Sequence, residues 1–144
     1  MTDAPFPRLR SVALDTTDAR GLAEFYRQLL GYAYLPGDEP PADGADDERA
    51  RDWLVLVEPG GRVRLAFQHV DRLTPSTWPS GDVPQQVHLD LSVPDAESLV
   101  EQRDRAIALG ARVLEDRLTD PDEPLYVFAD PAGHPFCIFV VPPE

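Results

Sequence analysis

The fold is decided by a repeated stretch, which reads His88-Leu89-Asp90-Leu91-Ser92-Val93-Pro94-Asp95-Ala96 in its second copy. The first copy reads Ser11-Val12-Ala13-Leu14-Asp15-Thr16-Thr17-Asp18-Ala19. The match continues downstream, so that the shared pairs are Leu14 and Leu91, Asp18 and Asp95, Ala19 and Ala96, Leu22 and Leu99, and Glu24 and Glu101. Each copy predicts a short strand, an aspartate that caps a helix, and an amphipathic helix that ends at a glycine. The chain therefore consists of two similar halves.

Around the repeats, hydrophobic alternation and helical spacing predict the order βαβββ in each half. In the first half we expect a strand over 8–15, a helix over 19–30, and strands over 32–35, 53–57 and 63–70. In the second half we expect a strand over 87–93, a helix over 96–109, and strands over 112–116, 125–129 and 135–141. With 144 residues the chain has the length of one domain, spanning 1–144, with modules at 8–70 and 86–142 and a connector at 71–85.

Composition excludes several classes of function. The net charge of −13 opposes binding to nucleic acids or to anionic membranes. The absence of lysine excludes Schiff-base chemistry, and the single cysteine, Cys137, excludes an internal disulfide and any multi-cysteine metal site. No apolar run reaches the length of a membrane span, so we expect a soluble cytoplasmic protein.

Each predicted helix has one apolar side, which we expect to pack on a sheet. The second helix should bury Leu99, Ala106 and Ile107. We expect the acidic segment 36–52 to be a solvated and mobile loop, and His134, in the last turn, to face solvent. The fold class is then α+β: two βαβββ modules form a cup-shaped mixed sheet with the helices outside.

Three segments carry a resemblance to a known family: Phe25-Tyr26-Arg27-Gln28-Leu29-Leu30-Gly31, His88-Leu89-Asp90-Leu91, and Asp130-Pro131-Ala132-Gly133-His134-Pro135-Phe136. In this order and spacing the chain resembles the vicinal oxygen chelate superfamily of glyoxalase I, extradiol dioxygenases, and fosfomycin- and bleomycin-resistance proteins. Within it, the chain is most similar to the glyoxalase-like proteins of actinobacteria, on segments 65–68, 78–79 and 84–86. The resemblance implies a small-molecule site inside the cup and a homodimer.

The resemblance also implies where a divalent metal would bind. Metal-using members place their four ligands at the positions of Ser11, Gln68, His88 and Cys137, and of these only His88 is a residue type that the family uses. One imidazole, one hydroxyl and one neutral amide are a poor donor set for a catalytic divalent ion. We therefore expect no metal. The alternative is a zinc, iron or nickel site that keeps Gln68, His88 and Cys137, with Asp90 as a rescuing ligand.

Without a metal, the same positions still suggest chemistry. His88 is the natural general base, oriented by Asp90 or Gln68, and the alternative is a histidine that only forms hydrogen bonds. Cys137 is either an activated thiolate or an inert packing residue. The candidate catalytic residues are His88 and Cys137, and the candidate ligand-binding residues are Ser11, Trp53, Gln68, His88, Asp90 and Cys137.

Three functions remain open at this point. The first is a glyoxalase- or bleomycin-resistance-like protein that holds a small planar or aromatic molecule, which can be cationic, in a metal-free cup and thereby sequesters it. The second is a lyase, isomerase or dioxygenase-type enzyme that uses His88, with or without a metal. The third is a dimeric interaction module without a ligand.

Overall fold

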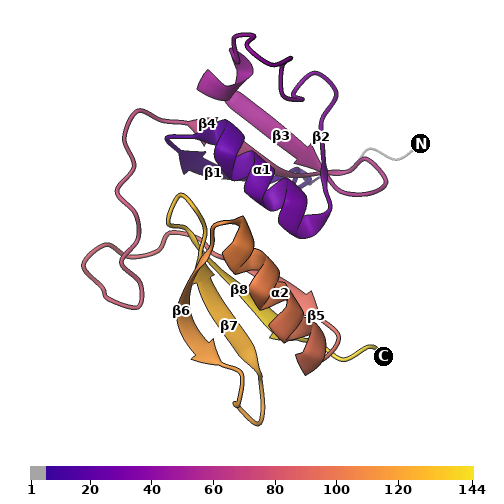
Figure 1. Cartoon of the computed structure of the whole chain (residues 1–144), viewed down its shortest axis with the longest axis vertical. Coiled ribbons are helices and arrows are strands. Elements are labelled where there is room, and N and C mark those ends of the chain that lie inside the picture. The colour runs from indigo at the N-terminus through magenta and orange to yellow at the C-terminus, as the bar shows by residue number, and fades with distance from the viewer. Residues whose placement is uncertain (1–5) are drawn as a thin grey trace.

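The first half of the chain folds as predicted, into βαβββ, in a computed structural model that describes residues 6–144 (Figure 1). Its elements are β1 (Val12–Thr16), α1 (Ala19–Leu30), β2 (Ala33–Tyr34), the 3-10 turn η1 (Arg49–Arg51), β3 (Trp53–Val57) and β4 (Val63–His69). The first strand begins at Val12 rather than at Arg8, because pairing with β4 starts at Val12 and Leu65.

The second half repeats this order. Its elements are β5 (Leu89–Val93), α2 (Ala96–Leu109), β6 (Arg112–Arg117), β7 (Leu125–Ala129) and β8 (Pro135–Val140). Both helices begin at the predicted aspartates: the Asp18 carboxylate accepts the Gly21 N–H at 2.9 Å, and that of Asp95 accepts the Ser98 N–H at 2.7 Å. Both end at a glycine with positive φ, Gly31 or Gly110, which confirms the predicted boundaries.

The strands form two four-stranded sheets with the same topology, β1-β4-β3-β2 and β5-β8-β7-β6. In each sheet the first strand pairs in parallel with the last and the other pairs are antiparallel, so both sheets are mixed. The register is also equivalent, because Val12 pairs with Leu65 in one sheet and Leu89 with Phe136 in the other. Strands β1 and β5 are therefore equivalent edge strands.

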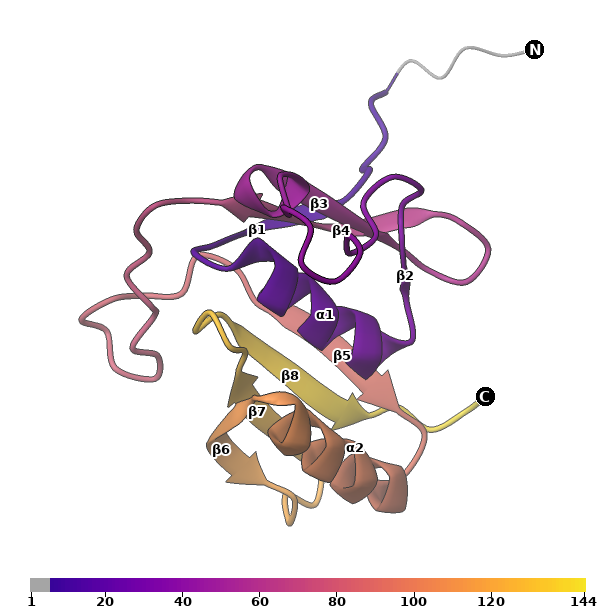
Figure 2. The same ribbon diagram turned by 45° about the horizontal axis from the view of Figure 1, so that its top comes forward.

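One hydrophobic core joins the modules. Each helix covers one face of its own sheet, and α1 also contacts α2 and β8 of the other module (Figure 2). The Tyr26 ring of α1 stacks on Phe67 of β4 at 5.9 Å between centroids and meets Phe136 of β8 edge-on at 6.1 Å. The α+β class and the two βαβββ modules are thus confirmed.

Polar contacts also connect the modules. The hydroxyl of Tyr26 donates to the buried Asp130 carboxylate at 2.6 Å, across the module boundary. The other Asp130 oxygen accepts the backbone N–H groups of Ala132 and His134, which shapes the β7–β8 turn. Nε2 of His134 donates to the Asp15 carbonyl at 2.7 Å in an exposed contact, so this half-buried residue also links the two modules. This turn is a structural link.

Two further expectations are corrected. Leu99 and Ala106 are buried, but Ile107 is 47% exposed, because it lies on the side of α2 away from the sheet. The acidic segment is an ordered loop, since Asp38 is buried, accepts the Val55 N–H at 2.9 Å and pairs with Arg49 at 2.6 Å. Within residues 6–144, neither helix has the length and apolar character that crossing a lipid bilayer requires.

Candidate functional site

The face of the second sheet opposite its helix carries a row of polar side chains. Successive side chains of a strand point to opposite faces, and the core residues Phe136 and Ile138 define the helix side. On the other side, strand pairing aligns one row across four strands: Asp90, Cys137, Val127 and Glu115. His88, two residues before Asp90, points to the same face.

Three of these side chains lie within reach of one another. Nε2 of His88 is 3.2 Å from an Asp90 carboxylate oxygen. Ligand atoms of His88, Asp90 and Cys137 all lie within 4.8 Å of one another. Asp90 is therefore the carboxylate that orients the His88 ring, one of the two partners that the sequence suggested.

The cysteine of this cluster is not activated. Burial, together with the smaller effects of the negative charges of Asp90, Glu115 and Glu123, raises the pKa of the Cys137 thiol to about 11. A thiol with this pKa is almost entirely protonated near neutral pH, which favours the packing interpretation over a nucleophile. The same shift shows that three carboxylates surround this position.

Glu115 is a site residue that the sequence reasoning missed. Plain alternation would place it on the same face as Val113, which pairs with Phe128 on the helix side. A β-bulge between Val113 and Glu115 adds one residue to the strand and turns Glu115 to the opposite face. No local signal in the sequence marks this bulge.

The equivalent row of the first sheet is apolar. It consists of Ala13, Ala66 and Val55, and the equivalent registers make Ala66 the counterpart of Cys137. Ala66 is 1% exposed and Val55 6%, so this row is packed closely even though no helix covers it. The first module therefore has a mostly buried apolar row where the second module carries carboxylates and an imidazole.

The remaining predicted residues lie on the first sheet but do not join the cluster. Gln68 pairs with Asp15 on one side and Trp53 on the other, one row away from Ala66. Ser11 directly precedes β1 and lies level with Arg64, four residues along β4 from Gln68. A cavity of about 220 Å³ is lined by both Ser11 and Asp90, so the edge strands β1 and β5 lie near one another at this point.

These positions do not fit the family's four metal ligands. At the rise of a β-strand, Ser11 and Gln68 lie roughly 13 Å apart along the sheet, too far to share one ion. The first module thus contributes no ligand pair. His88, Asp90 and Cys137 are donors that zinc accepts, but their hydrogen bonds to one another account for their proximity without an ion.

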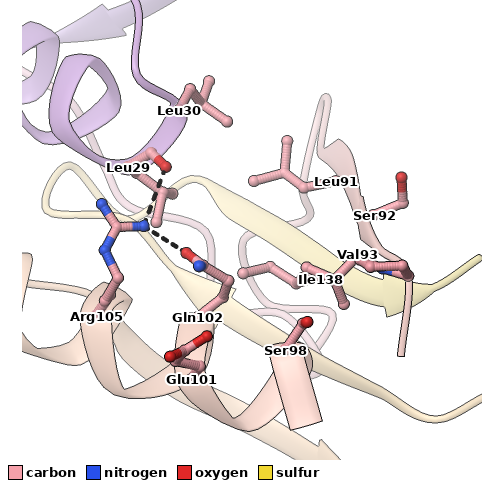
Figure 3. Close-up of a pocket in the computed structure, with 11 residues that line it drawn as sticks. Leu29, Leu30, Leu91, Ser92, Val93, Ser98, Glu101, Gln102, Arg105 and Ile138 are labelled. Carbon is pink, nitrogen blue, oxygen red and sulfur yellow. Dashed lines mark hydrogen bonds between the residues drawn. The ribbon is translucent and has the colours of Figure 1, made fainter. Parts of the chain in front are cut away.

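A second hollow lies at the module boundary on the helix side. It has a volume of about 350 Å³ and lies between the end of α1, strand β5 and helix α2 (Figure 3). Arg105 of α2 reaches across it to donate to the carbonyls of Gln28, at 2.7 Å, and Leu29, at 3.5 Å, the last turn of α1. A guanidinium at this position satisfies free carbonyls at a helix C-terminus. Its evident role is to hold the modules together.

The fold and these faces define a class: small α+β proteins built from paired βαβββ modules, the vicinal oxygen chelate superfamily. Residues 11–139 match the family model described as a glyoxalase-like domain. The chain belongs to this family. Among the curated proteins, none shows significant similarity to the chain.

Solved structures support the same fold. A glyoxalase/bleomycin resistance protein/dioxygenase family enzyme from Burkholderia phytofirmans PsJN superposes with a TM-score of 0.66 at 19% identity, covering 92% of this chain and 97% of that one. A glyoxalase/dioxygenase from Nostoc punctiforme gives 0.61 at 22% identity, with 100% and 98% covered. A lactoylglutathione lyase from Agrobacterium tumefaciens gives 0.57 at 18% identity, with 95% and 96% covered. At these identities the similarity establishes the fold alone.

Proposed function

We propose that this glyoxalase-like protein binds a small, planar, cationic molecule without a metal, and that binding serves to sequester it. The observation that carries the proposal is the contrast between the two free sheet faces. Asp90 and Glu115 lie on one polar row, and the apolar row Ala66 and Val55 lies on the adjoining sheet. The carboxylates of the polar row would stabilise the charge of a bound cation, and Ala13, the exposed member of the apolar row, is the part of that row that an apolar ring could reach.

The charge of the chain supports this choice of ligand. The net charge of −13 attracts cations to the molecule, and the carboxylates around Cys137 concentrate that potential on one face. Two structural relatives, from Burkholderia phytofirmans PsJN and Albidiferax ferrireducens T118, are described as glyoxalase/bleomycin resistance proteins, which makes an antibiotic a natural ligand class to test.

A second candidate is a metal-independent lyase or isomerase. The pairing of His88 with Asp90 favours it, since a carboxylate that fixes an imidazole is the usual support for a general base. In this function His88 would remove a proton from a bound substrate. Turnover that His88→Ala abolishes, with ligand binding retained, would distinguish this candidate from sequestration.

The test is a thermal-shift and calorimetric titration with benzyltrimethylammonium, its uncharged carbon analogue, and bleomycin. We expect the cation to raise the melting temperature more than the neutral analogue, because a ligand bound only by the folded state stabilises it. The double variant Asp90→Asn/Glu115→Gln should lose this effect. Asp43→Asn/Asp71→Asn, two exposed carboxylates elsewhere, is the control with the same change of charge.

Two outcomes would contradict the proposal. Equal shifts by the cation and its neutral analogue would remove the electrostatic argument. Near-stoichiometric zinc, iron or nickel in protein purified without added metal would replace the metal-free site with a metal centre. If no member of the panel binds, the chain is better described as an interaction module.

We also propose that the chain is a cytoplasmic homodimer of the actinobacterial glyoxalase-like type, with neither nucleic acid nor membrane as a partner. Its overall acidity supports the exclusion of both polyanionic partners. Light scattering after gel filtration measures the oligomeric state directly.

A further inference from the structure

Most arginines of this acidic protein are already neutralised. Seven of the 13 form ion pairs with carboxylates, and Arg105 donates to backbone carbonyls. Within residues 6–144, five guanidinium groups have neither an ion pair nor a hydrogen bond: Arg8, Arg10, Arg62, Arg72 and Arg112. If the positive charge only served solubility, these five would be scattered over the surface.

Three of the five instead lie at one cavity. Arg8 and Arg10, on the segment before β1, and Arg62, on the β3–β4 hairpin, line a hollow of about 470 Å³ together with Arg64. The topology causes this, because β1 runs parallel to β4 from the pair Val12–Leu65, and residues before β1 therefore lie beside the start of β4. Figure 1 shows the N-terminal segment and this hairpin at the same end of the first sheet.

Such a cluster is suited to an anion. Arg64 is compensated by Glu58 at 2.9 Å, whereas Arg8, Arg10 and Arg62 line the same hollow without an ion pair among the described residues. Guanidinium groups offer planar, forked donors that match the oxygens of a phosphate or a carboxylate. In a protein with a net charge of −13, an anion approaching the rest of the surface is repelled, which makes this patch distinctive.

An apolar cavity adjoins the cluster. The 220 Å³ cavity between β1 and β5 shares Leu9, Arg10 and Arg64 with the arginine-lined hollow. Its inner wall is mostly apolar, formed by Val12, Leu30, Tyr32, Leu65, Leu89 and Leu91. A molecule that spans both cavities would therefore place an anionic group at the arginines and an apolar body against this wall.

We propose that the arginine cluster and this cavity form a second site, which binds a small molecule with a phosphate or carboxylate at one end and an aromatic or aliphatic body. The cavity is also lined by Asp90, which the cation-binding proposal uses, but the arginines that would hold the anion belong to this site alone. Variants of Arg10 and Arg62 therefore test this site separately from the cation-binding function.

The experiment is calorimetric titration at low ionic strength with 1-naphthyl phosphate, 1-naphthoate, 1-naphthylmethanol and inorganic phosphate. We expect both naphthyl anions to bind more tightly than inorganic phosphate and than the neutral alcohol, and binding to weaken with added salt. The ratio of the dissociation constants of 1-naphthyl phosphate and 1-naphthoate shows whether the site prefers a phosphate or a carboxylate.

Variants then locate the binding. Arg10→Gln/Arg62→Gln should weaken 1-naphthyl phosphate binding by about tenfold or more, because charge-assisted hydrogen bonds are lost. Arg72→Gln/Arg112→Gln removes the same charge from uncompensated arginines elsewhere and should leave binding unchanged. Leu9→Ser, at a side chain that is 88% exposed, should weaken the naphthyl anions but not inorganic phosphate, without affecting folding.

Several results would overturn the site. Equal losses in the two double variants would show a general charge effect, and inorganic phosphate binding as tightly as 1-naphthyl phosphate would remove the apolar cavity from the site. If no anion binds, and Arg10→Gln/Arg62→Gln instead converts a dimer to a monomer in light scattering, the cluster is a contact between two copies of the chain.

Discussion

The helix-free faces of the two sheets have the same backbone and opposite chemistry. At equivalent positions the first sheet carries Ala13 and Ala66 where the second carries Asp90 and Cys137. Because the topology and register are the same, this difference comes from side chains alone. Duplicated modules thus allow one copy to supply an apolar row while the other supplies charge.

The asymmetry also explains why the family's metal site does not fit this chain. A four-ligand centre needs donors from both modules, and here the first module presents alanine at the central position of the row. The second module retains an imidazole, a carboxylate and a thiol, which satisfy one another. The polar cluster is consequently confined to one half.

The largest effect on folding stability is expected at Ala66, at the centre of the apolar row, when it is compared with its counterpart Cys137 in the polar row. Ala66→Asn places an amide where the side chain is 1% exposed and should lower the free energy of unfolding by about 3 kcal/mol. Cys137→Asn, at the equivalent but half-buried position, should cost less than about 1 kcal/mol. Urea denaturation measures both. Equal costs would mean that the two faces do not differ as described.

The contact between the modules should give the next largest effect. Tyr26→Phe removes the hydroxyl that donates to buried Asp130, and should cost about 2 kcal/mol. The matched variant is Tyr126→Phe, whose hydroxyl accepts only from Arg103 within one module, and its cost should be about 1 kcal/mol or less. A larger effect at Tyr126 would contradict the role assigned to the bridging bond.

The same variant has a predictable pH dependence. Burial raises the pKa of Asp130, and the Tyr26 hydroxyl opposes that rise. Without the hydroxyl the folded-state pKa moves further above its unfolded value, so folding stability falls as the pH rises through that range. The cost of Tyr26→Phe should therefore be greater at about pH 8 than at about pH 5. A cost independent of pH would show that Asp130 keeps the same charge throughout.

A smaller effect on folding stability is expected at Arg105 of the second module, which donates to carbonyls at the end of helix α1 of the first. Arg105→Ala removes donors from the last carbonyls of α1 and should cost about 1 kcal/mol. Arg105→Lys keeps the positive charge but lacks the planar guanidinium with its paired N–H donors, so it should retain part of the stability that Arg105→Ala loses. Arg112→Ala, at an uncompensated arginine outside the boundary, is the control and should be neutral within error.

The smallest effect is expected in the reactivity of Cys137. With its pKa raised to about 11 by burial, the thiol should react slowly with iodoacetamide at neutral pH. Asp90→Asn removes the next contribution to that shift, so the pKa should fall and labelling should accelerate several-fold. The rate is followed by mass spectrometry. Rapid labelling of the native protein, abolished by His88→Ala, would instead show an activated thiolate.

Much of the fold could be predicted from local patterns. The bounds of β3 and β7 follow from apolar runs between turn residues, and those of both helices from capping aspartates and terminal glycines. The expected mobility of the acidic loop was wrong because order there comes from Asp38, which binds Val55, a residue of a distant strand. The bounds of the loop were visible in the sequence, but its anchoring contact was not.

The candidate site was only partly predictable. Alternation placed His88 and Asp90 on one face of their strand, and the resemblance to the family placed Cys137 at the same spot. It could not place Gln68 relative to Ser11, because that depends on the register between β1 and β4. It also missed Glu115, whose direction is set by the bulge in β6.

The sequence by itself determined that this protein consists of two copies of one βαβββ unit, because helix caps, turns and hydrophobic periods are short-range signals. It also determined that, at the equivalent positions Ser11 and His88, only the second copy carries a histidine. The tertiary structure decided what those residues meet: the row Asp90, Cys137 and Glu115, the bridge from Tyr26 to Asp130, and the cluster of Arg8, Arg10 and Arg62. These arrangements depend on strand register and on the packing of one module against the other, and both are long-range properties that no local pattern encodes.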